Sequence, residues 1–193
     1  MIDAVIPNNN EKEFIEIAEK LGYKKIIFLY TTEKNVPQIK SEKIKIDFGI
    51  LTTKGGKGKH KTFMQSGEND QNIIENNSPN VIFGFEAKSE KDYIHQRASG
   101  LNHIMCTFAQ KNNVVIAFSF QQILKSYKSK RAQIIGRIKQ NIKLCRKYKV
   151  TMAIASFATN HYEMRAPQDM QAFFCLMGMH PAEAKKAVET LNF

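Results

Sequence analysis

Tryptophan is absent from this chain of 193 residues, cysteine occurs only three times, and no apolar run is long enough to span a membrane. A spanning helix needs about 20 consecutive apolar residues. Cys106, Cys145 and Cys175 are widely spaced, odd in number and set among apolar residues, which is typical of reduced thiols rather than of a disulfide framework or a zinc site. Residues 1–7 lack the basic and apolar segments of a signal peptide. We therefore expect a cytoplasmic protein with no membrane partner.

Acidic side chains are missing from a long central part of the sequence. No aspartate or glutamate occurs between Tyr93 and Tyr162, a stretch of roughly 70 residues that we call the acid-free segment. Over the whole chain, 29 lysines and arginines face 18 acidic residues, which gives a net charge of +11. This surplus favours a polyanionic partner, either nucleic acid or an anionic membrane face, over a merely basic surface. The cations of the segment are Arg97, Lys111, Lys125, Lys128, Lys130, Arg131, Arg137, Lys139, Lys143, Arg146, Lys147 and Lys149.

Short β-like runs alternate with helical ones along the chain. The patterns predict strands at residues 1–6, 25–30, 44–51, 81–86, 114–120 and 151–158, and helices at 10–21, 92–112, 130–148, 167–177 and 181–191. Ser89 and Ser99 are both candidate caps for the helix at 92–112. Residues 52–80 show little periodicity, which predicts a long basic loop region with a short helix near 71–75.

Buried strands that alternate with helices form mainly parallel sheets. The pattern therefore predicts a single α/β domain over residues 1–193, either a small TIM-barrel-like (β/α) barrel with mainly parallel strands or an open doubly wound sheet. In both folds, functional groups collect at the carboxyl ends of the strands. Those ends are expected at residues 86–92, 120–130 and 158–165.

A second basic element lies inside the predicted loop region. Lys54, Lys57, Lys59 and Lys61 alternate with glycines and with His60. A phosphate-binding P-loop requires Gly-Lys followed directly by Ser or Thr, and neither Gly-Lys pair here meets that requirement. The two remaining interpretations are a flexible loop that becomes ordered on a phosphate backbone and a plain surface loop.

Recognisable catalytic motifs are also missing. The five histidines form no HxH, HExxH or comparable metal-binding pattern, and neither GxSxG nor a GxGxxG after a strand occurs. Glu86, Asp92 and His95 can meet near one strand end, and His161 can meet Glu163 near another, so a metal cluster stays open as a minor alternative. We predict no catalytic residue, no metal site and no cofactor in the protein itself.

Two segments resemble a known family. The first is residues 92–103, DYIHQRASGLNH, followed by NNVVIAFSF at 112–120, and the second is residues 162–169, YEMRAPQD. Over roughly 81–191 they resemble the archaeal and eukaryotic ribonuclease P protein component 3 family, the thirty-kilodalton subunit. The residues that match the family pattern are His95, Arg97, Ser99, Gly100, Asn102, Tyr162, Arg165 and Pro167.

The resemblance implies a TIM-barrel-like fold related to metal-dependent phosphoesterases but without their metal ligands. It implies a non-catalytic protein subunit of ribonuclease P, the hydrolase and endonuclease of tRNA processing that removes the 5′ leader from precursor tRNA. The RNA subunit of that ribonucleoprotein carries the catalysis and is expected to need Mg2+. The implied partners are the ribonuclease P RNA, precursor tRNA and a small second protein subunit.

The late strand departs from the family pattern. Residues 156–159 read Ser-Phe-Ala-Thr where the family often has Ser-Gly-Ala-Arg, and Glu163 stands where Asp is usual. The matched residues either contact RNA or connect the strand-end loops to one another. The candidate RNA-binding residues are Lys54, Lys57, Lys59, Lys61, Arg97, Lys125, Lys128, Lys130, Arg131 and Arg165. The alternative functions are a metal-dependent phosphoesterase on the same barrel and a protein-interaction scaffold.

Overall fold

The computed structural model describes residues 1–33, 39, 41–88, 91–93 and 95–192. Its strands are all parallel and lie side by side in the order in which they occur along the chain. They are β1 (Ile2–Val5), β2 (Lys25–Tyr30), β3 (Lys45–Thr52), β4 (Lys61–Gln65), β5 (Val81–Phe83), β6 (Val115–Ser119) and β7 (Met152–Ala155).

The first and last strands meet and nearly close the sheet into a barrel. The amide of Phe157, just after β7, donates to the Ala4 carbonyl over 2.8 Å, and the amide of Ile6 donates to the Ala158 carbonyl over 2.8 Å. Asp3 of β1 adds a side-chain link, because its Oδ1 accepts a hydrogen bond from the Ser156 amide over 2.6 Å. The prediction of a parallel α/β barrel is therefore confirmed, and an open doubly wound sheet is excluded.

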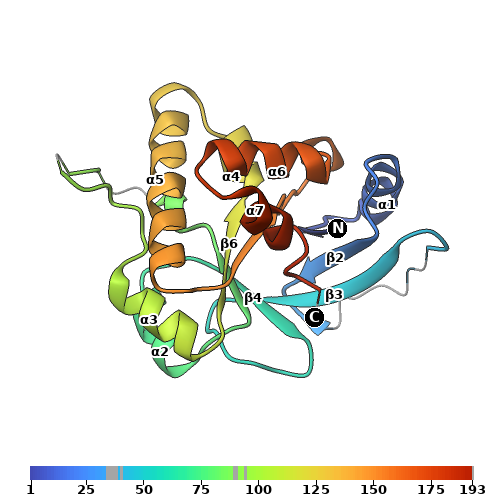
Figure 1. The fold of residues 1–193 in the computed structure, drawn as a ribbon. Coiled ribbons are helices and arrows are strands. Elements are labelled where there is room, and N and C mark those ends of the chain that lie inside the picture. The colour runs from blue at the N-terminus through green and yellow to red at the C-terminus, as the bar shows by residue number, and fades with distance from the viewer. Residues whose placement is uncertain (34–38, 40, 89–90, 94, 193) are drawn as a thin grey trace.

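Helices cover the outside of the strands (Figure 1). They are α1 (Glu11–Lys20), α2 (Asp70–Asn76), α3 (His103–Lys111), α4 (Phe120–Leu124), α5 (Lys128–Lys147), α6 (Pro167–Leu176) and α7 (Pro181–Ala187), with short 3-10 turns at η2 (Phe85–Ala87) and η3 (His161–Glu163). None of the helices among the residues that the structure describes has both the length and the apolar character needed to cross a membrane.

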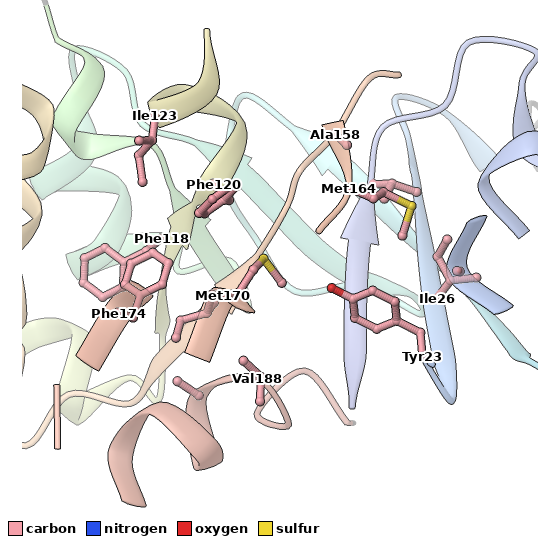
Figure 2. Packing of buried hydrophobic residues seen from close by; sticks show 14 of the residues in the cluster. Tyr23, Ile26, Phe118, Phe120, Ile123, Ala158, Met164, Met170, Phe174 and Val188 are labelled. Atoms are coloured by element: carbon pink, nitrogen blue, oxygen red, sulfur yellow. The ribbon is translucent and has the colours of Figure 1, made fainter. Parts of the chain in front are cut away.

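Apolar side chains fill both sides of the barrel wall. The interior cluster includes Leu29, Phe63, Phe83, Ala117 and Phe157, all of them buried. Outside the wall, a larger cluster packs the strands against α1, α4, α5, α6 and α7. Figure 2 shows part of that cluster, where Phe118 of β6 lies against Phe174 of α6 with ring centroids 5.8 Å apart.

The predicted helix at 92–112 is wrong in its first half. The described residues between 91 and 102 are irregular, and α3 begins only at His103. Its cap is Asn102, whose Oδ1 accepts a hydrogen bond from the Met105 amide over 2.8 Å. Ser99 is not the cap, and Ser89 lies outside the described residues. Gly100 has a φ of +78°, which a helix cannot contain.

Two further predictions needed correction. The region 52–80 is not one long loop, because it contains β4 as well as the expected short helix, here α2. The predicted strand at 81–86 ends at Phe83, since Gly84 takes a left-handed backbone with φ +90° and η2 follows. Residues 120–124, which lie at one of the expected strand ends, form α4.

Candidate nucleic-acid interface

The loops that follow β5, β6 and β7 lie at one end of the barrel, because parallel strands end at the same edge. We call this region the carboxyl-end surface; it comprises residues 91–93, 95–102, 120–131 and 156–166. It contains six of the ten candidate RNA-binding residues, namely Arg97, Lys125, Lys128, Lys130, Arg131 and Arg165.

A fully buried arginine on α5 holds the loop after β5. Arg137 donates from Nε to Asp92 Oδ1 over 2.9 Å and from Nη1 to the carbonyls of Glu86 and Lys88 over 3.0 and 2.7 Å. Asp92 also accepts from the Ala98 amide and pairs with Arg97 at 3.4 Å. Burial alone would raise the pKa of Asp92, but the hydrogen bond and charge of Arg137 outweigh it and hold the pKa below its usual value. In the sequence alone, Arg137 is indistinguishable from the other cations of the acid-free segment.

Below this pair lies a second buried polar contact. Asn141 Nδ2 donates to Glu86 Oε1 over 2.7 Å and to the Ser99 carbonyl over 3.0 Å. Burial raises the pKa of Glu86 to about 7, despite the opposing effects of the Asn141 hydrogen bond and the Arg137 charge. Glu86 is thus a buried support for the loop. It does not join Asp92 and His95 in a cluster of ligands among the described residues.

The family-pattern residues of the first motif mostly connect the loop to its neighbours. Gln140 Nε2 of α5 donates to Ser99 Oγ over 2.9 Å and to the Arg97 carbonyl over 3.1 Å. Gly100 lies so close to Phe85 that an added Cβ would stand 2.5 Å from its carbonyl oxygen. Asn102 caps α3. His95 is exposed.

The second motif is also anchored. Arg165 Nη1 donates to the carbonyls of Tyr162 and Met164 over 2.9 and 2.7 Å, so its guanidinium braces its own loop. Pro167 is the first residue of α6, as its fixed φ favours. Tyr162, in contrast, projects outward and is 77% exposed.

An ion pair connects the loops after β6 and β7. Lys125 Nζ lies 3.1 Å from Glu163 Oε1 and donates to Thr159 Oγ1 over 2.9 Å. Glu163 also accepts from Gln121 Nε2 over 2.6 Å and from the Thr159 amide over 3.0 Å. Burial would raise the pKa of Glu163, but these hydrogen bonds and the Lys125 charge hold it below its usual value. Glu163 therefore carries a charge at neutral pH and ties the two loops together.

The remaining cations of this surface differ in how firmly they are held. Arg131 donates to the carbonyls of Ile123, Leu124 and Ser126 and so closes the end of α4. Lys130 Nζ donates to the Lys88 carbonyl over 3.2 Å. Lys128 is exposed at the start of α5.

The second basic element, residues 54–61, lies at the other end of the barrel, and we call it the glycine–lysine loop. Lys57 Nζ donates to the Asn112 carbonyl over 3.0 Å, at the end of α3 that leads into β6. The Gly56 amide donates over 2.7 Å to the carbonyl of Asn77, which follows α2 and precedes β5. Exposed Lys54, Lys57, Lys59 and Lys61 therefore form a separate amino-end group, and the structure does not bring them together with the carboxyl-end surface.

Two stacked rings lie in the interior cluster near the carboxyl ends of β5 and β7. Phe83 and Phe157 stack with centroids 3.9 Å apart and planes 6° apart. Phe157 has a φ of +49°, a conformation that a bulky side chain rarely adopts unless its surroundings hold it there. Within the described part of the chain, no group of three or more His, Cys, Asp or Glu side chains lies close enough together to hold a metal ion.

A parallel barrel with an apolar interior and cations on its strand-end loops defines the chain as an α/β barrel scaffold with a basic surface. Residues 91–192 match the family model described as RNase P subunit p30, and the chain belongs to this family.

Similar proteins carry the corresponding name. Ribonuclease P protein component 3 of Methanosarcina acetivorans is 33% identical over 95 residues, which cover 49% of this chain and 40% of that protein. Its counterpart in Methanococcus maripaludis strain C6 is 27% identical over 197 residues, which cover 97% of this chain and 77% of that protein. This chain thus spans 40% of the length of the Methanosarcina acetivorans relative. A chain in a cryo-EM structure of archaeal ribonuclease P with mature tRNA shares the fold, with a TM-score of 0.79 and 20% identity over 100% of this chain and 88% of that one.

Proposed function

We propose that this chain is a non-catalytic protein subunit of an archaeal ribonuclease P and supports RNA-catalysed removal of the 5′ leader from precursor tRNA. Its partners in that role are the ribonuclease P RNA, precursor tRNA and a small second protein subunit. The Mg2+ of the reaction belongs to the RNA catalyst.

One observation carries the proposal: the acid-free segment lies inside the region that matches the family. Residues 93–162 lie wholly within the matched residues 91–192. Of the cations there, Lys128, Lys139 and Lys143 are exposed, and no carboxylate among the described residues lies within ion-pair distance of them. A basic surface without neighbouring acids favours a phosphate backbone as its partner.

The contacts described above suggest how such a subunit works. Arg137, Asn141 and Gln140 of α5 fix the backbone of the loop after β5, and Lys125 with Glu163 fixes the two loops beside it. A surface that is ordered before binding loses less entropy when RNA binds. The firmly held arginines therefore position loops, and the exposed lysines remain for phosphates.

The test is cleavage of precursor tRNA by the cognate ribonuclease P RNA with its small protein subunit, in the presence and absence of this chain. We expect stimulation only when the RNA is present, with steep loss of RNA affinity as salt rises, because each neutralised phosphate releases counterions. Cleavage by the chain alone would instead support the phosphoesterase alternative. If the chain neither stimulates cleavage nor binds RNA, the protein-interaction scaffold is the alternative that remains.

A further inference from the structure

Three tyrosine rings stand out from the carboxyl-end surface, and two of them belong to the neighbouring loops after β6 and β7, whereas Tyr93, 75% exposed, belongs to the loop after β5. Tyr127, in the loop after β6, is 73% exposed, and Tyr162, in the loop after β7, is 77% exposed. Two other tyrosines are used internally: Tyr23 is buried and donates its hydroxyl to the Arg165 carbonyl, and Tyr30 donates to Glu11. No such hydrogen bond holds the hydroxyl of Tyr127 or Tyr162 among the described residues, so packing does not account for either ring.

The backbone beneath both rings is fixed. Tyr127 immediately precedes α5, and the guanidinium of Arg131, itself held by three carbonyls, lies 5.6 Å from the centre of its ring. Tyr162 lies in η3, which a reciprocal capping box between Asn160 and Glu163 stabilises. Rigid aromatic side chains on a fixed backbone provide contact area at low entropic cost.

The two rings belong to neighbouring loops. β6 and β7 pair directly, and Lys125 joins the loops beyond them through Glu163 and Thr159. Tyr127 is two residues from Lys125, and Tyr162 is next to Glu163. Tyr127 and Tyr162 therefore stand on two loops that are linked to each other.

Charge identifies the kind of partner. Residues 120–131 and 156–166 together contain Lys125, Lys128, Lys130, Arg131 and Arg165 but only one acid, Glu163, and that acid is already paired with Lys125. Exposed aromatic rings among unopposed cations match a chain of phosphates that carries flat, apolar bases. A duplex keeps its base faces stacked inside, so only unpaired nucleotides can use the rings.

We propose that Tyr127 and Tyr162 form a stacking platform for unpaired nucleotides of an RNA, with the exposed Lys128 beside it to bind the phosphates. The proposal rests on the proposed function, since it specifies the kind of RNA that this surface binds. Stacking requires only a ring face, so the platform binds bases with little sequence preference.

The first experiment measures binding of the full chain to a single-stranded oligouridylate of about 12 nucleotides and to an RNA duplex of equal length. We expect Tyr127→Leu and Tyr162→Leu each to weaken single-strand binding roughly 5- to 100-fold, the range for loss of one stacked base. Duplex binding and the salt dependence should not change, because no cation is removed. Tyr127→Phe and Tyr162→Phe should bind as the wild type does, since the ring face remains.

Leu176→Ser is the matched control, because Leu176 is 75% exposed but lies on α6, outside the carboxyl-end surface. We expect it to leave both affinities unchanged, and thermal unfolding checks that every variant is folded. A spectroscopic readout is also available, since the chain has no tryptophan. The emission of Tyr127→Trp should be quenched by the single strand and unaffected by the duplex.

The outcomes separate this proposal from the proposed function. Wild-type affinity in both leucine variants, or no single-strand binding by the wild type, overturns the platform. If the chain still stimulates precursor tRNA cleavage in that case, the subunit assignment stands without the platform. If the leucine variants lose single-strand affinity but the chain gives no stimulation, the platform stands and the subunit assignment is wrong.

Discussion

Arg137 is the largest of the fully buried side chains and the most informative single residue of the fold. A buried guanidinium is tolerated only when its donors are matched by acceptors. Here Asp92 and two backbone carbonyls supply them, all from the loop after β5. The conformation of the loop after β5 on the carboxyl-end surface therefore depends on Arg137, which is itself buried.

Replacing Arg137 by Met should reduce the free energy of unfolding by about 3–5 kcal/mol, because Asp92 and the two carbonyls lose their partner. Urea unfolding measures the change. Lys139→Met, exposed on the same helix, should shift the free energy by less than about 0.5 kcal/mol. Equal effects of the two variants would mean that the buried pair contributes nothing particular.

Asp3, at the junction of β1 and β7, predicts an unusual pH dependence. Burial raises its pKa from 3.8 to about 7, against the hydrogen bonds from Ser156 and Ala4, and its Oδ2 has no partner among the described residues. Between these two pH values the folded protein retains a proton that the unfolded chain has lost. The stability that this group contributes is thus complete below pH 4 and is lost as the pH rises through about 7.

Asp3→Asn removes that titration and keeps an acceptor for the Ser156 amide. Relative to wild type, the variant should gain stability steadily as the pH rises from 4 to 7, and the gain should level off above pH 7 after a rise of about 4 kcal/mol. Urea unfolding at a series of pH values tests this. Glu86 titrates in the same window in both proteins, so only the difference between them is diagnostic. Parallel pH curves would contradict the prediction.

Helix α5 is the element that joins the core to the surface. Ile134, Ile138 and Ile142 face the core, the neighbouring positions Arg137 and Asn141 hold the loop after β5, and Lys139 and Lys143 are exposed. Figure 1 shows α5 on the outside of the barrel, beside the green segment that follows β5. The same twenty residues thus provide packing, loop anchoring and exposed positive charge.

Substitutions in the glycine–lysine loop can test whether the amino end of the barrel also binds RNA. If it does, changing Lys54, Lys57 and Lys59 to Ser should lower the slope of log affinity against log salt by up to about two, since each single-strand phosphate contact contributes about 0.7. The measurement is RNA affinity at several salt concentrations. Lys12→Ser, Lys20→Ser and Lys24→Ser, on and just after α1, remove the same charge elsewhere and serve as the control. An unchanged slope would identify the loop as a plain surface loop.

Most elements could be predicted from the sequence, and the failures have physical causes. The helix at 10–21 and the strand at 25–30 carry clear periodicity or a continuous apolar run, and α1 and β2 lie there. β4 has only five residues within a glycine- and lysine-rich region, so its pattern is too short to recognise. The start of α3 was misplaced because the carbonyls of Arg97 and Ser99 accept hydrogen bonds from Gln140 and Asn141, far away in sequence. The ion pair of Lys125 with Glu163 was hidden for the same reason.

At the scale of the whole molecule, the two basic groups lie at opposite ends of the barrel. Sites that are well separated and share no partners usually change binding free energy independently. The variant with Lys54, Lys57 and Lys59 changed to Ser, when combined with Lys128→Ser, should therefore weaken RNA binding by the sum of the two separate effects, within about 0.5 kcal/mol. Affinities of the two variants and their combination for one precursor tRNA give the comparison. A clear departure from additivity would mean that RNA connects the two ends or that one change alters the other end.

The barrel closes through a contact of very long range. Each strand pairs with the next one along the chain, but the hydrogen bond from Ser156 to Asp3 spans 153 residues. During synthesis, β1 therefore has one unpaired edge until residues 156–158 have left the ribosome, and unpaired edges invite association with other chains. Limited proteolysis of ribosome-stalled chains that end before and after this point would detect the closure as a step in protection. The contacts that protect the free edge of β1 can form only after residues 156–158 have been synthesised.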